Sequence, residues 1–217
     1  MEAIQEIIAI LKERYPEALC ALQYRRDYEL MISVRLSAQC TDARVNLVTP
    51  ALFERFPTLE AFAAAEPEEV EPYVRSCGFY KHKARDIVLA CRMLRDEYGG
   101  KVPDTMEQLL RIPGVGRKTA NVIQSVVFNK AAMAVDTHVF RVSHRLGLVG
   151  PSCTTPLSVE KELTKHIPEA DIPIAHHWLI LHGRYVCQAR TPQCDACGLK
   201  MLCKDYEKRT GIKEVNS

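Results

Sequence analysis

The sequence predicts an all-α protein, and three observations support this fold class. Apolar residues recur at three- and four-residue spacing along most of the 217-residue chain, which is the periodicity of amphipathic helices. Proline and glycine interrupt these stretches at short intervals, as they do between helices. No alternation of apolar and polar residues persists for more than a few positions, so no β-sheet is expected.

The expected helices follow one another from the N-terminus to about residue 183. The first covers residues 2–14, where Ile4, Ile7, Ile8 and Leu11 form one apolar stripe. The others cover residues 26–38, 42–54, 58–65, 67–75, 80–97, 105–111, 117–129, 137–145, 156–166 and 173–183. We expect the polar tail after about Lys208 to fray.

Helix breakers separate most of these stretches. They are Pro16, Pro57, Pro67, Gly78, Gly99, Gly100, Pro103, Pro113, Gly114, Gly147, Gly150, Pro151, Pro168 and Pro173. Capping residues mark two helix starts, because a short polar side chain accepts a hydrogen bond from the free N–H groups of the first turn. Asp104 or Thr105 is the expected cap at 105–111, and Asp136 is the expected cap at 137–145.

The composition indicates a folded intracellular protein. Hydrophobic residues make up 47% and charged residues 26%, so the chain can form a core and disorder is not expected. The absence of a long apolar run predicts no membrane span. The first residues, up to Pro16, match neither a secretory nor a transit pattern, so we expect a cytoplasmic protein.

Positive charge is concentrated in one part of the chain. The net charge of +2 says little about partners, but residues 111–145 contain six Lys or Arg against one acid, Asp136. Such a basic region suits phosphate binding, although solvated helix faces often have the same composition.

The most informative segment is residues 112–118, with the sequence Ile-Pro-Gly-Val-Gly-Arg-Lys. Gly114 and Gly116 permit a close backbone approach, and Val115 would plug the turn into the core. The turn directs N–H groups outward at a helix start, which can hold a phosphate without reading base sequence. A plain turn between antiparallel helices is the alternative. The longer match, Leu110-x-x-Pro-Gly-Val-Gly-x-x-Thr-Ala, favours a DNA-binding helix-hairpin-helix that includes Arg117.

Two residues near this hairpin are candidate catalytic groups. Lys118 lies in the first turn of the second helix, where the positive end of the helix dipole favours the neutral, nucleophilic amine. Asp136 could support positive charge on a sugar and assist proton transfer. The alternatives are a phosphate contact for Lys118 and simple capping for Asp136. His138 could orient Asp136, contact phosphate or be a structural histidine.

Four cysteines near the C-terminus have the spacing of metal ligands. Six, two and five residues separate Cys187, Cys194, Cys197 and Cys203. Four thiolates fit either a tetrahedral zinc site or a [4Fe-4S] cluster, and the single Cys-x2-Cys pair favours the cluster. Basic residues near them could contact a DNA backbone, among them Arg184 and Arg190. The other five cysteines, Cys20, Cys40, Cys77, Cys91 and Cys153, are expected to be small core residues.

Several segments together resemble the endonuclease III family over about residues 5–205. The segments are Leu36-Ser37-Ala38-Gln39, the stretch from Leu110 to Asn121, Val135–Val142, His177–Arg184 and the four cysteines, in the same order and spacing. The resemblance implies two helical domains flanking a DNA-binding cleft. A six-helix domain would cover residues 21–130, and residues 1–20 with 131–217 would form a domain with a C-terminal [4Fe-4S] cluster loop.

The resemblance also implies roles for single residues. Lys118 matches the nucleophile and Asp136 the catalytic carboxylate of the family. Cys187, Cys194, Cys197 and Cys203 match the cluster ligands. Gln39 matches the residue that enters the duplex where the damaged nucleotide has left, and Phe79 stands where the family often has a leucine wedge. His138, Arg141, Arg184 and Arg190 are expected DNA contacts, together with Gly114, Val115, Gly116, Arg117 and Lys118 of the hairpin.

The implied activity is that of a bifunctional DNA glycosylase and abasic-site lyase. Its expected substrates are oxidised pyrimidines, such as thymine glycol, and abasic sites in double-stranded DNA. We expect a monomer in the bacterial nucleoid with no membrane partner. The alternatives are a monofunctional mismatch glycosylase, whose known members lack a lysine at position 118, and a non-catalytic DNA-binding module.

Overall fold

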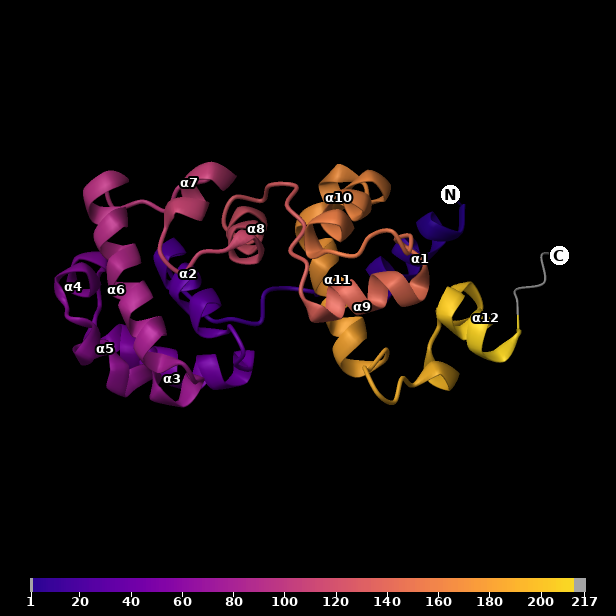
Figure 1. Ribbon diagram of the computed structural model, residues 1–217, viewed down its shortest axis with the longest axis horizontal. Coiled ribbons are helices and arrows are strands. Elements are labelled where there is room, and N and C mark those ends of the chain that lie inside the picture. Colours follow the sequence, from indigo (N-terminus) through magenta and orange to yellow (C-terminus); the bar gives the residue numbers. More distant parts are fainter. Residues whose placement is uncertain (1, 213–217) are drawn as a thin grey trace. The chain divides into compact units, whose positions relative to one another are not determined.

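The structure is a computed structural model that describes residues 2–212, and helices are the only regular elements in this range. The chain divides into two compact units (Figure 1). One unit runs from Cys20 to Phe128, and the other contains the described residues up to Leu19 and from Asn129 onwards. No helix among the described residues is both long and apolar enough to cross a membrane.

The unit formed by residues 20–128 is a helical bundle around its own core. Its helices are α2 (Asp27–Leu36), α3 (Asp42–Arg55), α4 (Leu59–Ala64), α5 (Pro67–Val74), η1 (Arg75–Cys77), α6 (Tyr80–Glu97), α7 (Met106–Arg111) and α8 (Arg117–Val126). The long helix α6 packs against α4 and α5, and α8 packs against α2 and α7. Fully buried side chains from these helices fill the core, including Leu30, Phe62, Ile87, Leu109 and Ile123.

The second unit joins the N-terminal helix to the part of the chain that begins at Asn129. It contains α1 (Glu2–Arg14), α9 (Thr137–Leu146), α10 (Pro156–His166), η2 (Glu169–Asp171), α11 (Ile172–Tyr185), η3 (Cys194–Ala196), η4 (Lys200–Leu202) and α12 (Lys204–Thr210). Ile7 and Leu11 of α1 are buried in one core with Val139 of α9 and Trp178 of α11. The helix at the N-terminus therefore completes the unit that carries the four cysteines.

The eleven helices expected from periodicity are all present, and three have the predicted bounds: α1, α6 and α10. Two expectations are wrong. Of the five cysteines expected in the core, Cys20 and Cys40 are only half-buried. The chain does not fray from Lys208, because α12 continues to Thr210 and ends at Gly211 in the left-handed conformation. Its Arg209 bonds Asp205 one turn earlier, at 2.8 Å. A short polar helix of this kind has no apolar stripe to reveal it. The end of the tail, residues 213–217, lies outside the described residues.

The turn between α7 and α8 packs directly against an ion pair. Val115 is buried, as predicted, and its N–H donates to the carbonyl of Ile112 at 3.1 Å. Gly114 has a φ of +77°, and a Cβ atom there would lie 2.7 Å from Nε of Arg35 and 2.9 Å from Cβ of Asp86. Arg35 and Asp86 are themselves paired at 2.7 Å. Only glycine combines this backbone conformation with so close an approach.

Replacing Gly114 by alanine is expected to destabilise the unit, and Gly116 supplies the matched control. Gly114→Ala should lower the free energy of unfolding by roughly 2–4 kcal/mol, because the left-handed conformation and the contact with the ion pair both disfavour a methyl group. Gly116→Ala should cost less than about 1 kcal/mol, since a Cβ atom there meets nothing within 4 Å. Urea unfolding measures both variants. Equal losses would show that Gly114 is not sterically required.

Candidate active site and cysteine cluster

Lys118 projects from the beginning of α8, directly after the hairpin. Gly116 is the N-cap of this helix and Arg117 its first residue, so Lys118 belongs to the first turn, and it is exposed. Burial raises the pKa of the nearby Cys20 thiol, and the positive charge of Lys118 is among the effects that oppose the rise. The hairpin therefore presents an accessible amine beside the outward N–H groups of a helix N-terminus, as the sequence predicts for this segment.

Asp136 is the N-cap of α9, which confirms the capping interpretation. Its Oδ1 accepts hydrogen bonds from the N–H groups of His138 and Val139, both at 2.8 Å. Within the part of the chain that the structure describes, Oδ2 accepts no hydrogen bond. Capping fixes one oxygen and leaves the other for chemistry, so the two roles are compatible. Lys118 and Asp136 belong to different units.

His138 and Arg141 lie together on α9. Nη2 of Arg141 is 3.2 Å from Nδ1 of His138 and donates to the carbonyls of Gly183 and Cys187 at 2.9 and 3.1 Å. The His138 ring also lies against Gly183, where a Cβ atom would come within 3.1 Å of Nδ1. Arg141 thus ties α9 to the end of α11 and to the first cysteine. This structural role was not predicted from the sequence, while the predicted DNA contacts of both residues stay predictions.

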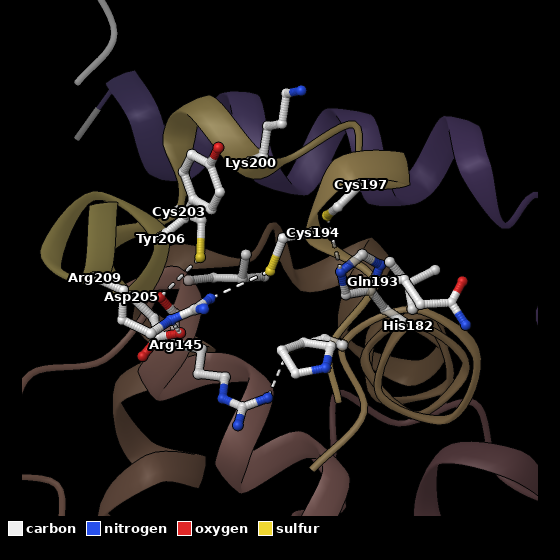
Figure 2. A pocket seen from close by; sticks show the side chains of 14 residues that line it. Arg145, His182, Gln193, Cys194, Cys197, Lys200, Cys203, Asp205, Tyr206 and Arg209 are labelled. Carbon is white, nitrogen blue, oxygen red and sulfur yellow. Dashed lines mark hydrogen bonds and ion pairs between the residues drawn. The ribbon is translucent and has the colours of Figure 1, made fainter. Parts of the chain in front are cut away.

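The four cysteines predicted as ligands line one pocket (Figure 2). Each sulfur has a polar neighbour. Nη1 of Arg145 lies 3.5 Å from Sγ of Cys187, and Nη2 of Arg209 lies 3.2 Å from Sγ of Cys194. Sγ of Cys197 is 3.6 Å from Nε2 of His182, and the thiol of Cys203 donates to the carbonyl of Arg145 at 3.2 Å. The four cysteines with metal-ligand spacing in the sequence therefore lie around one pocket, while metal binding by them stays a prediction.

The surroundings of this pocket act in opposite directions on negatively charged sulfur. Burial raises the pKa of the Cys197 and Cys203 thiols, so isolated thiolates would be unfavourable there. The guanidinium groups of Arg145 and Arg209 supply positive charge at two other sulfurs. A bound metal group would favour deprotonation of all four, since thiolates are the ligating form. Among residues 2–212, no three His, Cys, Asp or Glu side chains are grouped closely enough to hold one metal ion.

His182 links the pocket to the N-terminal helix. It is buried, and burial lowers its pKa to about 4. Its Nδ1 lies 3.1 Å from the hydroxyl of Tyr15, while Nε2 faces Cys197. No role in the cysteine pocket was predicted for His182 or Arg145, while Arg209 is one of the basic residues that lie near the cysteines in the sequence. Their only signal was proximity in sequence to the cysteines or to the basic region.

Gln39 and Phe79 occupy loops of the other unit and line a common pocket with residues of α2 and α6. Phe79 is 65% exposed, which is unusual for a phenylalanine, and Gln39 is exposed as well. Both residues have left-handed backbones, with a φ of 54° at Gln39 and 47° at Phe79. Of the other predicted contacts, Arg117 and Arg190 are exposed and Arg184 is half-buried.

Comparison with known proteins agrees with this geometry. Residues 32–169 match the family described as HhH-GPD superfamily base excision DNA repair protein. Endonuclease III of Synechocystis is 48% identical over 199 residues, which are 91% of this chain and 90% of that protein.

Two solved structures are similar over nearly the whole chain. A trapped endonuclease III–DNA covalent intermediate, an estranged-adenine complex, is 48% identical with a TM-score of 0.89 and covers 95% of this chain and 98% of that chain. A non-covalent endonuclease III–DNA complex is 47% identical with a TM-score of 0.91, over 97% and 98%. At this identity and coverage, the chain belongs to the endonuclease III family within the HhH-GPD superfamily.

Proposed function

We propose that this protein is a bifunctional DNA glycosylase and abasic-site lyase of base excision repair, with Lys118 as its nucleophile. The observation that carries the proposal is the exposed amine of Lys118 in the first turn of α8, beside a hairpin whose Gly114 is sterically required. A related endonuclease III has been captured in a covalent intermediate with DNA, which supports a covalent mechanism.

Binding begins at the sugar–phosphate backbone. The N–H groups of Gly114 and Gly116 can hold a phosphate, while the N–H of Val115 bonds Ile112 and shapes the turn, and Arg117 adds positive charge. The target nucleotide must leave the helix stack, which costs a few kcal/mol and less for a damaged base. Gln39 and Phe79 offset this cost by filling the gap, because both are exposed on neighbouring loops.

Lys118 then carries the covalent chemistry. Its neutral amine attacks C1′ of the sugar, the N–C1′ bond forms and the bond to the base breaks, with the departing base taking up a proton. Loss of a proton from nitrogen and opening of the sugar ring give a Schiff base. The Schiff base makes the C2′ proton acidic, and its removal expels the 3′ phosphate by β-elimination. Hydrolysis releases Lys118 and the cleaved strand.

Asp136 supports the positive charge that develops on the sugar as the base departs. Its Oδ1 is fixed by two N–H groups of α9, so the free Oδ2 has a defined direction. A carboxylate held in this way needs no rearrangement during the reaction. The backbone N–H of His138 is one of the two donors, which gives that residue an orienting role.

The cysteine pocket fits a [4Fe-4S] cluster held by Cys187, Cys194, Cys197 and Cys203. The four cysteines around this pocket would supply the four thiolates that such a cluster takes. The bound cluster would fix the chain between α11 and α12, and Arg184 and Arg190 would then be presented to DNA. The domain of residues 1–20 and 131–217 would carry the cluster, and that of residues 21–130 the hairpin.

The proposed substrates are oxidised pyrimidines of the thymine glycol type and abasic sites in duplex DNA, acted on by a monomer. A monofunctional glycosylase would release the base but leave the strand largely intact, and a DNA-binding module would do neither. Incubation with a thymine-glycol duplex and an abasic duplex, followed by assays for free base and strand cleavage, separates the three functions.

Substitution of Lys118 tests the nucleophile. With borohydride present, the unaltered protein should form a covalent adduct with thymine-glycol DNA, whereas Lys118→Gln should form none, because the amide cannot make a Schiff base. Denaturing gel electrophoresis of labelled DNA measures the adduct. Lys101→Gln, which also removes an exposed lysine from this unit, is the control and should trap normally. An adduct with Lys118→Gln would disprove the assignment.

Two substitutions of Asp136 separate catalysis from capping. Asp136→Asn should slow base release by about 10²–10⁴-fold, because it removes the negative charge, while stability and DNA affinity stay nearly unchanged, since asparagine is an equally good N-cap. Asp136→Ala should lose the same activity and also about 1 kcal/mol of stability. Single-turnover kinetics, DNA binding and urea unfolding measure these effects. Normal base release by Asp136→Asn would leave capping as the whole role.

Metal analysis tests the proposed cluster. Protein purified without oxygen should contain about four irons and four sulfides per chain, and Cys203→Ser should lower both, because a thiolate ligand is lost. Cys153→Ser is the matched control, since Cys153 is a buried cysteine of the same unit outside the pocket, and it should retain the metal. Zinc in place of iron, or full iron content in Cys203→Ser, would contradict the assignment.

A further inference from the structure

Lys83 is a buried lysine that the proposed chemistry does not use. It lies on α6, its side chain is 1% exposed, and burial lowers the pKa of its amine. Lysine is among the residues least often buried, so its position needs an explanation. The structure supplies one, because Nζ donates to three backbone carbonyls: Leu36 at 2.8 Å, Ala38 at 2.7 Å and Cys77 at 2.8 Å.

These three carbonyls lie one to three residues before the two residues that are proposed to enter the DNA. Leu36 ends α2, and Ala38 directly precedes Gln39. Cys77 ends η1, two residues before Phe79. A single ammonium group therefore holds the Gln39 loop and the Phe79 loop to each other. An ammonium has three N–H donors, and each of them here has one acceptor.

Both loops have unfavourable backbone conformations at the residue they present. Only three residues other than glycine have positive φ in the range 2–212: Gln39, Phe79 and Asn129. Asparagine adopts this conformation readily, whereas glutamine and phenylalanine do so at a cost in free energy. Such strain persists only where the surroundings hold the backbone in place, and it is concentrated at functional sites. The bonds from Lys83 are the constraint that lies next to both strained residues.

We propose that Lys83 is a positioning residue that fixes the spacing and direction of Gln39 and Phe79 before DNA binds. The inference rests on the proposed function, since it assigns Lys83 to the gap-filling step. Loops that are already ordered lose little conformational entropy when they enter the duplex, so more of their interaction energy favours the flipped nucleotide. Without the ammonium, three carbonyls would lose a buried donor and the two loops could separate.

The hairpin packs against side chains that also line the pocket of Gln39 and Phe79. The pocket lined by Gln39, Phe79 and Lys83 also contains Arg35 and Asp86. The same ion pair lies under the hairpin at Gly114. The loops that fill the gap and the turn that holds the phosphate are thus built on one set of side chains from α2 and α6.

The test compares Lys83→Met, which has no donor, with Lys83→Gln, which keeps two and is the variant more certain to fold. Lys101→Met is the control for loss of one positive charge in the same unit. Base release from a thymine-glycol duplex should fall roughly 10- to 100-fold in Lys83→Met and less in Lys83→Gln. Strand cleavage of a single-stranded abasic oligonucleotide, which has no gap to fill, should change less than about twofold. Equal losses on both substrates, or no loss on the duplex, would overturn the proposal.

Two further measurements separate positioning from general damage. Adding Phe79→Ala to Lys83→Met should cause little further loss on the duplex, because both changes disable the same step, whereas fully additive losses would contradict the proposal.

In the free protein, amide hydrogen exchange should accelerate at residues 37–40 and 77–83 in Lys83→Met and stay unchanged at residues 106–126. The exchange measurement needs no DNA, so it tests whether Lys83 holds the two loops even if the unaltered protein proves inactive on both substrates. Unchanged exchange around Gln39 and Phe79 would refute it.

Discussion

The contact between Gly114 and the Arg35–Asp86 ion pair determines where α8 begins. Because the turn has no side chain at this point, it can lie directly on the pair, and the helix that follows starts at Arg117 with its first N–H groups turned outward. Because α8 begins at Arg117, Lys118 lies in its first turn. One turn later in the helix, the same amine would have lost both the free N–H groups and the positive end of the dipole.

Four positive side chains of this protein donate to carbonyls at helix ends and in loops. Lys83 does so after α2 and η1, and Arg92 does so after α4, where it donates to Ala63 and Ala65 at 2.9 and 2.7 Å. Arg141 and Arg145 bond the carbonyls of residues 183 and 187–189 around the first cysteine. The last carbonyls of a helix have no partner within the helix, so a long cation is a suitable one. Loops with functional roles are thereby fixed without large apolar contacts.

The sequence predicted the helices well because apolar spacing and breakers are local signals. It also predicted the buried Val115, the Asp136 cap and the grouping of four cysteines, each of which follows from short spacing. The short helix α12 was missed because it has no apolar stripe. Lys83, Arg145 and His182 were missed as well, since their partners lie far away in the sequence and a lysine in an amphipathic helix normally faces solvent.

The most direct test of the central claim is to locate the covalent bond to DNA. After borohydride trapping with an abasic duplex, nuclease and protease digestion, mass spectrometry should find the reduced sugar remnant on one peptide, with the modification on Nζ of Lys118. A remnant on any other lysine, or on the N-terminal amine, would contradict the account, because Lys118 would then not be the nucleophile.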